Sequence, residues 1–320
     1  MLLPHLRPLW RDRTTLQLGT DPSRAVVLEF ADPAAARLVD LLDGSHTERV
    51  LLNAAAAQGI AATLAHDVIG TLRDAGVVID AYALLPRELS PEERQRLYPE
   101  AAALALRAEE TGRTPATVLR RRQGAHVLVG GVLGHPDGVE PLAALVADTL
   151  TAAGVGRVSP SRTDPIPRTG DTFVVRVGTE RRPAALVARA YAQRGVAHIT
   201  VAVRDGVVVV GPLVPPAGSP CLSCLDLHRT DRDPAWPSLA AQLATGSEQP
   251  LTCAATTRVT AAAYVADEVL AYLDGLPART RGASVEVSGP DRFRRRTWPP
   301  HPRCDCRRGR RTAVRAQEST

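Results

Sequence analysis

The chain has 320 residues, with 39 basic side chains against 34 acidic ones and a formal net charge of +5. This length is sufficient for two domains with separate cores. Every basic residue is arginine, and the lack of lysine excludes Schiff-base catalysis and P-loop phosphate binding, which both require one. No signal-peptide pattern opens the sequence and no apolar run approaches the ~20 residues that cross a bilayer, so we expect a cytoplasmic protein with no membrane partner.

The positive charge is concentrated near the C-terminus. Residues 291–320 hold ten arginines against three acids, so the preceding 290 residues are slightly negative. The ten are Arg292, Arg294, Arg295, Arg296, Arg303, Arg307, Arg308, Arg310, Arg311 and Arg315. Such a segment can bind nucleic acid or an acidic peptide, but it is more often a solvated terminus. We expect a solvated basic tail at 307–320 and no nucleic-acid partner.

Residues 1–82 are predicted to form a small module. Two strand-like runs, Thr15–Leu18 and Ala25–Phe30, flank a turn with glycine and proline at 19–22. Helical patterns follow at 33–42, 47–58 and 63–75, and a short apolar run at 77–79 suggests a closing strand. This order of elements predicts a winged-helix-like module.

The charge of this module bears on its partner. Residues 1–85 carry seven arginines against ten acids, so the electrostatic footprint that duplex DNA requires is missing and a DNA-binding regulator is disfavoured. The same architecture can instead add an extended peptide to a strand edge. We therefore predict peptide recognition beside Ala25–Phe30 or Thr15–Leu18, with the peptide packed on the third helix.

Residues 83–123 are predicted to be a helical linker, and 124–306 an α/β domain. Ser90 followed by Pro91 and two glutamates has the pattern of a helix N-terminus. Strands are then expected at 126–129, 155–158, 173–177, 198–203 and 207–210, a glycine turn at 130–134, and helices at 138–153, 183–194 and 256–273. Alternating strands and helices of this kind predict a doubly wound, Rossmann-like sheet.

Two short cysteine pairs lie in the last third of the chain. Cys221 and Cys224 form the first pair, and Cys304 and Cys306 form the second. Four thiolates from two such pairs make a closed tetrahedral zinc site, which is structural because no coordination position stays open. His301, just before the second pair, can turn that segment toward the ion. The alternative is two pairs of ordinary buried or disulfide-linked thiols.

A possible nucleotide loop is degenerate. Gly131 and Gly134 have the spacing of a dinucleotide or ATP fingerprint, but Val129 stands where the first glycine is needed. The acid expected after the second strand is replaced by a segment ending in Arg162, and nearby Asp164 precedes a proline. The simpler interpretation is that these glycines only pack a strand on a helix.

Several segments together resemble the ThiF/MoeB family, relatives of ubiquitin-activating enzymes. They are Val127–Gly156, Gly211–Val214 leading to the first cysteine pair, and His301–Cys306. Residues 211–237 further resemble actinobacterial cyclodehydratase-like proteins, also described as TOMM precursor leader peptide-binding proteins. The resemblance implies an N-terminal winged-helix peptide-recognition element, a ThiF-like domain with a zinc clasp, and a homodimer.

Active members of that family adenylate a carboxylate with an intact glycine loop, a ribose-binding acid, an arginine and a lysine, and a later aspartate. This chain departs from each of these elements, so we predict no ATP chemistry. In azole-forming pathways, the resemblance implies, a ThiF-like protein binds the leader region of a precursor peptide and a YcaO-type partner uses ATP. We therefore predict a non-catalytic, leader-peptide-binding scaffold for the biosynthesis of ribosomal peptides (RiPPs).

An alternative function depends on Cys253. It lies 29 residues after Cys224, just before the last predicted helix, where the family's activating enzymes place an acceptor thiol. The chain would then be an adenylyltransferase for a sulfur-carrier or ubiquitin-like protein. We favour the simpler interpretation that Cys253 is a small, buried apolar residue at the start of this helix. In the loop expected over 226–237, His228 is a possible extra ligand or base and Trp236 a possible partner contact.

Overall fold

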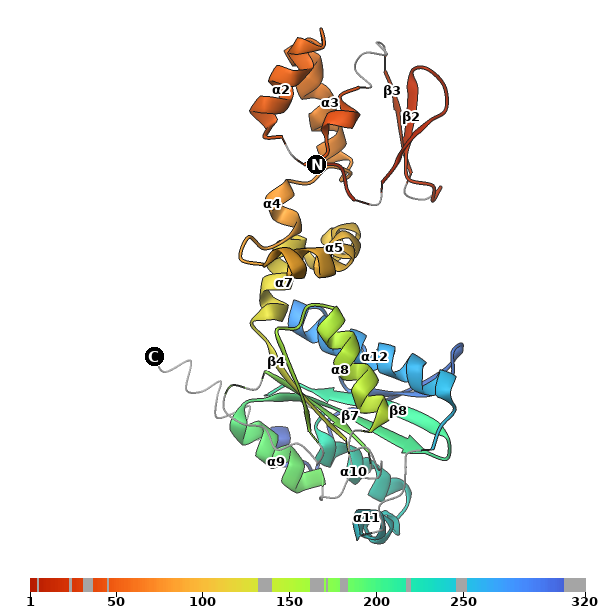
Figure 1. Ribbon diagram of the computed structural model, residues 1–320. Coiled ribbons are helices and arrows are strands. Elements are labelled where there is room, and N and C mark those ends of the chain that lie inside the picture. The colour runs from red at the N-terminus through yellow and green to blue at the C-terminus, as the bar shows by residue number, and fades with distance from the viewer. Residues whose placement is uncertain are drawn as a thin grey trace. The chain divides into compact units, whose positions relative to one another are not determined.

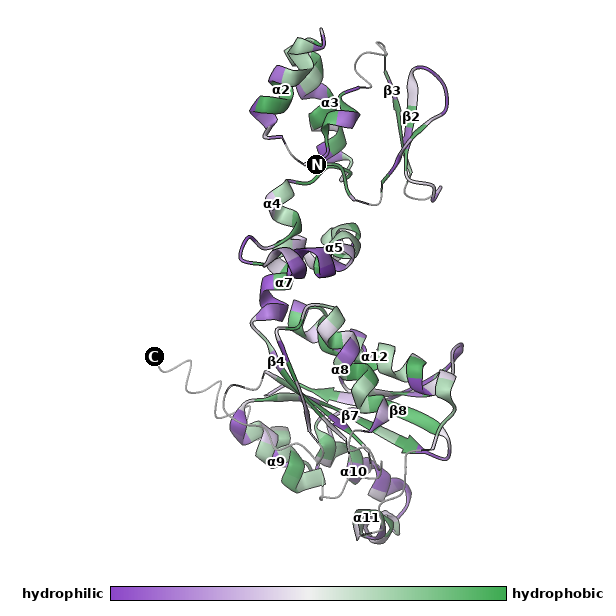
Figure 2. Cartoon of the chain, viewed as in Figure 1, coloured by the Kyte–Doolittle hydropathy of each residue, from purple (hydrophilic) through white to green (hydrophobic). Residues whose placement is uncertain are grey.

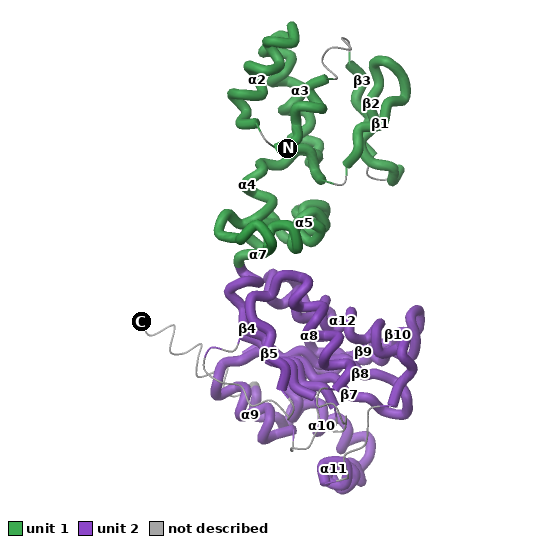
Figure 3. The backbone as a smooth tube through the Cα atoms, in the orientation of Figure 1, with its two compact units in different colours: residues 1–120 green, residues 121–320 purple. Residues whose placement is uncertain are grey.

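The computed structural model of the protein forms two compact units, Met1–Arg120 and Arg121–Thr320 (Figure 3). The description covers residues 1–4, 6–22, 25–30, 37–44, 46–131, 140–161, 170, 172–178, 184–216, 220–245 and 252–307 (Figure 1). The finer division of the chain at residues 82, 123 and 306 stays a prediction. Among these described residues, no helix combines the length and the apolar character that crossing a membrane requires.

The N-terminal unit contains a three-stranded antiparallel sheet in the order β1-β2-β3. Its strands are β1 (Pro8–Trp10), β2 (Thr15–Leu18) and β3 (Val26–Glu29). The last two coincide with the predicted runs, whereas β1 is three exposed residues without alternation and gave no signal. Since β2 is paired on both sides, the prediction that a peptide could add beside Thr15–Leu18 is wrong.

Two helices and a 3-10 turn pack on this sheet. They are η1 (Val39–Leu41), α2 (Glu48–Ala57) and α3 (Ala62–Asp74). Their core is built on the fully buried Leu16, Leu18 and Leu72. The predicted first helix falls partly on residues 31–36, outside the described residues, and the predicted strand at 77–79 is a single bridge from Val78 to Leu2. The winged-helix assignment stays a prediction.

Four more helices follow along the chain, and the last of them ends within the second unit. They are α4 (Ala81–Leu84), α5 (Pro91–Leu106), α6 (Ala108–Thr111) and α7 (Pro115–Gln123). Ser90 caps α5 as expected: its hydroxyl accepts from the backbone N–H of Glu93, whose carboxylate accepts from the N–H of Ser90. Helix α7 was not predicted, although proline is well tolerated in a first helical turn.

The second unit is built on a seven-stranded mixed sheet in the order β10-β9-β8-β7-β6-β4-β5. The strands are β4 (His126–Gly131), β5 (Arg157–Ser161), β6 (Phe173–Val177), β7 (Ala197–Arg204), β8 (Val207–Val214), β9 (Ala283–Gly289) and β10 (Arg292–Thr297). The first four are parallel and the last three join antiparallel. Strands β7 and β8 are largely hydrophobic, as interior strands should be (Figure 2).

Helices cover both faces of this sheet (Figure 1). They are α8 (Pro141–Ala152), α9 (Ala184–Arg194), α10 (Leu222–Arg232), α11 (Trp236–Thr245) and α12 (Ala255–Asp274), followed by η2 (Asp305–Arg307). Alternate residues of β6 pack into two different hydrophobic cores, one on each face of the sheet. Val175 packs with α8 and α12, whereas Val174 packs with α9 and α10. The predicted α/β sheet is thus confirmed, with a larger antiparallel half than expected.

Two sequence interpretations are corrected here. The segment at 226–237 is not a loop, because α10 and α11 occupy most of it. The arginines at 292, 294, 295 and 296 do not belong to a tail, because they form the exposed edge strand β10. Glu286 on β9 pairs with Arg294 and Arg296. Charged residues on an edge strand oppose unwanted strand pairing, which accounts for their position.

A buried ion pair fixes the end of α7 to α12. The Arg122 guanidinium donates from Nε and Nη2 to the two carboxylate oxygens of Asp274, at 2.9 and 2.7 Å. Its Nη1 donates to the carbonyl of Ala153, and both charged side chains are less than 5% exposed. A bidentate pair of this kind holds its geometry well but costs desolvation.

Candidate functional sites

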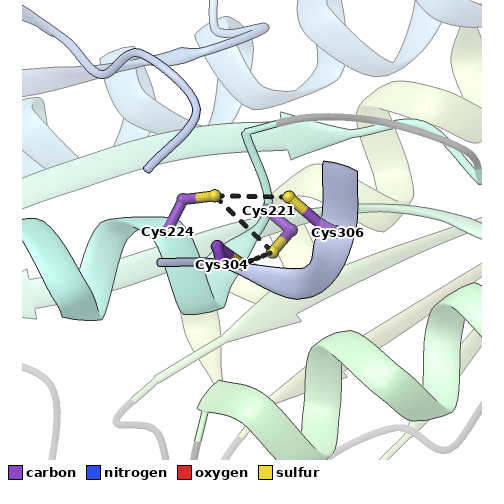
Figure 4. A group of neighbouring side chains, drawn as sticks. All are labelled: Cys221, Cys224, Cys304 and Cys306. Atoms are coloured by element: carbon purple, nitrogen blue, oxygen red, sulfur yellow. Dashed lines mark hydrogen bonds between the residues drawn. The ribbon is translucent and has the colours of Figure 1, made fainter. Parts of the chain in front are cut away.

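The four paired cysteines meet at one point of the second unit (Figure 4). Cys221 is the N-cap of α10 and Cys224 lies in its first turn, while Cys304 directly precedes η2 and Cys306 lies within it. The Sγ atoms are 4.0 Å apart between Cys221 and Cys224, 3.6 Å between Cys221 and Cys304, and 3.4 Å between Cys224 and Cys306. All four lie within 4.8 Å of one another.

This cluster fits a tetrahedral metal ion. Four thiolates held ~2.3 Å from a zinc ion would be about 3.8 Å apart, close to the distances found. A disulfide needs about 2.05 Å, and all five cysteines are free. Burial raises the pKa of the Cys224 and Cys304 thiols, so a metal must displace protons when it binds. The residues therefore suit structural zinc, and the identity of the ion stays a prediction.

His301 stabilises the segment that carries the second cysteine pair, although it is not one of the four clustered residues. Its Nδ1 accepts from the backbone N–H of Arg303 at 3.1 Å, so the proton lies on Nε2, which donates to Asp231 at 2.7 Å. This hydrogen bond, with the nearby Arg303, lowers the pKa of Asp231. The carbonyl of His301 also accepts from the N–H of Cys304. His301 thus ties the second cysteine pair to α10 without being a ligand.

His228 and Trp236 have structural partners. His228 Nε2 lies 2.8 Å from the carbonyl of Pro299 and therefore donates to it. Trp236 donates from its indole to Asp226 at 3.3 Å, and the Arg229 guanidinium lies 4.8 Å from its ring centroid. Neither residue belongs to the cysteine cluster.

The predicted glycine loop is described only up to Gly131. Strand β4 continues through Gly131, Val129 is fully buried, and Gly134, Arg162 and Asp164 lie outside the described residues. A Cβ on Gly131 would be 2.8 Å from the Cβ of Glu140. This glycine is therefore required for the close approach of α8. The interpretation of Gly131 and Gly134 as a degenerate nucleotide loop stays a prediction.

A glutamate side chain of the protein itself caps the N-terminus of α8. Glu140, 8% exposed, is the N-cap, and its carboxylate accepts from the N–H of Ala143 at 2.9 Å. Pro141 has no N–H to offer. In nucleotide-binding α/β folds, this helix end holds a phosphate. Sequence reasoning missed this feature, although a glutamate directly before a helix-starting proline is a visible signal.

Cys253 lies just before α12 and is half-buried. It makes a single β-bridge with Gly206 and packs against the core shared by α8 and α12. The four clustered cysteines do not include it.

The outer edge of β3, with which no described strand pairs, is the second candidate site. The N–H of Phe30 donates to Thr14 across the β2–β3 ladder. Because the pattern alternates, Val26 and Leu28 bond to β2 while Val27 and Glu29 direct their backbone groups outward. Val27 is 46% exposed.

The opposite edge, on β1, is less suitable. The N–H of Arg11 donates to Thr15, so the outward positions of β1 are Pro8 and Trp10. Pro8 lacks an N–H and cannot donate a hydrogen bond to an added strand. Within the described residues of this sheet, β3 therefore offers the better edge for another strand.

Together these features define an α/β unit with a four-cysteine cluster that suits a metal ion, preceded by a unit with a small sheet. No protein-family model matches the sequence, and no curated protein matches it. Solved structures show the likeness instead. A heterocyclase in complex with substrate and cofactor has a TM-score of 0.63 at 14% identity, over 93% of this chain and 38% of that one.

Two further structures share the fold. The heterocyclase TruD has a TM-score of 0.63 at 15% identity, over 96% of this chain and 42% of TruD. MccB of E. coli, with succinimide, has a TM-score of 0.59 at 13% identity, over 96% of this chain and 98% of MccB. The chain thus spans less than half of the two heterocyclases. These likenesses show the fold and agree with the resemblance found in the sequence, whereas the actinobacterial subtype stays a prediction.

Proposed function

We propose that this protein binds the leader region of a precursor peptide and presents it for azole or azoline formation by a separate enzyme. The observation that carries the proposal is the edge of β3 that no strand of the described residues covers. Its outward N–H groups at Val27 and Glu29 can pair with an extended peptide, as in strand addition to other peptide-binding domains. Val26 and Leu28 pack on the same core as α3, so a peptide strand would extend a supported sheet.

The proposed partner is suggested by the fraction of each heterocyclase that this chain covers. The two heterocyclases are more than twice as long as the region that this chain matches. In the pathways that the sequence resembles, a YcaO-type enzyme uses ATP, and we assign the chemistry to such a partner. The zinc cluster has a structural role in this proposal, and the scaffold acts as a cytoplasmic homodimer.

The α8 N-terminus supports a unit without ATP chemistry. The buried Glu140 carboxylate already satisfies an N–H that would otherwise be available to a phosphate. A phosphate placed there would meet a like charge in a poorly solvated position, which is unfavourable. Together with Val129 and the lack of lysine, this argues for a retained fold that has lost nucleotide binding.

The alternative is an adenylyltransferase with Cys253 as acceptor thiol. One observation favours it: MccB, whose length this chain nearly matches, has been crystallised with ATP. Titration of the metal-loaded protein with magnesium-ATP separates the two functions. We expect no heat of binding, whereas saturable binding would favour the adenylyltransferase and make Cys253 the residue to replace.

Binding of a fluorescent leader peptide, encoded beside this gene, tests the proposed function on the full-length protein. Val27→Pro removes one outward N–H of β3 and no hydrogen bond to β2, and we expect about tenfold weaker binding. Trp10→Pro is the matched control, because it makes the same change at the outward edge of β1. No binding by the wild type, or equal loss in both variants, would contradict the proposal.

A further inference from the structure

Strand β10 concentrates positive charge at one edge of the seven-stranded sheet (Figure 3). Four of its six residues are arginine, and five of the six are exposed. In the described part of the chain, no strand pairs with its outer side. The strand contains no proline, and its one irregularity lies at its start, between Arg292 and Phe293. Its outer edge can therefore accept another strand.

The hydrogen-bond ladder with β9 determines which backbone groups of β10 point outward. The N–H of Trp298 donates to the carbonyl of Gly282 at 2.8 Å, directly after the last strand pair. Because bonded and non-bonded pairs alternate in an antiparallel ladder, Arg294 and Arg296 bond to β9. The outward N–H and carbonyl groups belong to three residues: Phe293, Arg295 and Thr297.

On the sheet face away from α12, the arginine charges are only partly neutralised. Arg294 and Arg296 both interact with the carboxylate of Glu286 on β9, at 3.9 and 2.7 Å. One carboxylate therefore serves two guanidinium groups, which leaves positive charge in excess beside the outer edge.

The other face combines a charge with an apolar ring. Phe293 and Arg295 lie opposite two valines of β9 that belong to the core under α12. Phe293 is 49% exposed, and its ring centroid lies 6.0 Å from that of Tyr264 on α12. Arg295 donates to the carbonyl of Arg279 at 3.0 Å. This acceptor is neutral, so the positive charge of Arg295 is retained.

We propose that the outer edge of β10 binds an acidic, extended segment of another protein, which adds to the sheet as a further strand. The outward backbone groups supply the ladder bonds, and carboxylates opposite the arginines supply the selectivity. Like charges across neighbouring strands are destabilising, so a second copy of β10 is unsuitable as the occupant. The surface belongs to the second unit, and the proposal does not depend on peptide binding at β3.

The order of side chains along β10 specifies the sequence of this segment. Carboxylates suit the positions opposite Arg294, Arg295 and Arg296, and an apolar residue suits the position opposite Phe293. An antiparallel segment therefore has three acidic residues followed by an apolar one, and a parallel segment has the reverse order. A nucleic acid could also neutralise the arginines, but it would not use the outward backbone groups as a ladder partner. The open edge therefore favours a protein strand.

Fluorescence anisotropy of the full-length, metal-loaded protein with a labelled synthetic peptide tests this surface. The peptide carries Phe-Glu-Glu-Glu-Phe between threonine and valine flanks, which fits β10 in either direction. We expect saturable binding that weakens as salt is added. A matched peptide with glutamine in place of the three glutamates should bind about tenfold more weakly.

Two substitutions separate strand addition from simple charge attraction. Thr297→Pro removes one outward N–H, but no bond to β9 and no charge, so the glutamate peptide should bind about tenfold more weakly. Arg295→Gln keeps its N–H and should weaken binding about threefold. Arg157→Gln is the control and should change nothing, because it removes an exposed arginine from β5 at the opposite end of the sheet.

Three results would overturn the proposal. The first is a lack of saturable binding, or equal binding of the glutamate and glutamine peptides. The second is an affinity that Thr297→Pro leaves unaltered, since the peptide would then be held by charge alone. The third is a labelled oligothymidylate that binds more tightly than the glutamate peptide, which would assign these arginines to nucleic acid instead.

Discussion

Replacement of Cys304 by serine should cost the second unit much of its stability, because the cysteine cluster closes a long loop. Cys221 and Cys304 are 83 positions apart, and cross-linking a loop of that length lowers the entropy of the unfolded chain by an amount worth about 4.5 kcal/mol. For a unit of this size, each kcal/mol corresponds to about 2–4 °C in Tm. We therefore expect Tm to fall by about 9–18 °C.

Differential scanning calorimetry with metal analysis of the same samples measures this effect. Cys253→Ser is the control, since it removes a cysteine outside the cluster. Wild type and the control should each carry one zinc ion, and Cys304→Ser should carry less. If Cys304→Ser keeps both its metal and its Tm, or if wild type binds no metal, the assignment of the cluster is wrong.

Three further predictions follow from the second unit. Arg122→Met should destabilise by about 3–5 kcal/mol in urea unfolding, because it removes the bidentate ion pair of the buried Asp274 carboxylate. Arg120→Met, at an exposed pair, should cost under about 1 kcal/mol, and equal effects of the two substitutions would refute the burial argument. Since burial lowers the folded pKa of His198 to about 3, below the ordinary ~6.5, the unfolded state alone takes up this proton as pH falls between these values. Wild type should therefore lose about 1.4 kcal/mol per pH unit more than His198→Phe between pH 6 and 4, and parallel profiles would contradict this. Cys253→Ser should leave leader-peptide binding unchanged, and a loss of that binding would contradict a purely packing role.

The sequence anticipated the features that local patterns determine. Thr15–Leu18 and Phe173–Val177 alternate or cluster apolar residues enough to be read as strands, and both were found with the predicted bounds. The spacing of the cysteine pairs was equally informative, because a metal site needs few residues of specific type. These signals do not depend on distant parts of the chain.

Other features depend on tertiary packing and could not be read in this way. Strand β10 is rich in arginine, so its sequence looks like a solvated tail. Only its pairing with β9 in the folded protein shows that it is a strand. The outward direction of Val27 follows from the ladder with β2, which no single run reveals. His198 looks like any histidine in a strand, and only the folded structure shows that its ring nitrogens have no hydrogen-bond partner among the described residues.

Amide hydrogen exchange of the full-length protein, with and without the leader peptide, tests the central claim most directly. If the peptide adds to β3, exchange at the backbone amides of Val27 and Glu29 should slow on binding, while that of Trp10 on the opposite edge stays unchanged. Peptide binding that leaves Val27 and Glu29 exchanging as fast as in the free protein would contradict strand addition at this edge.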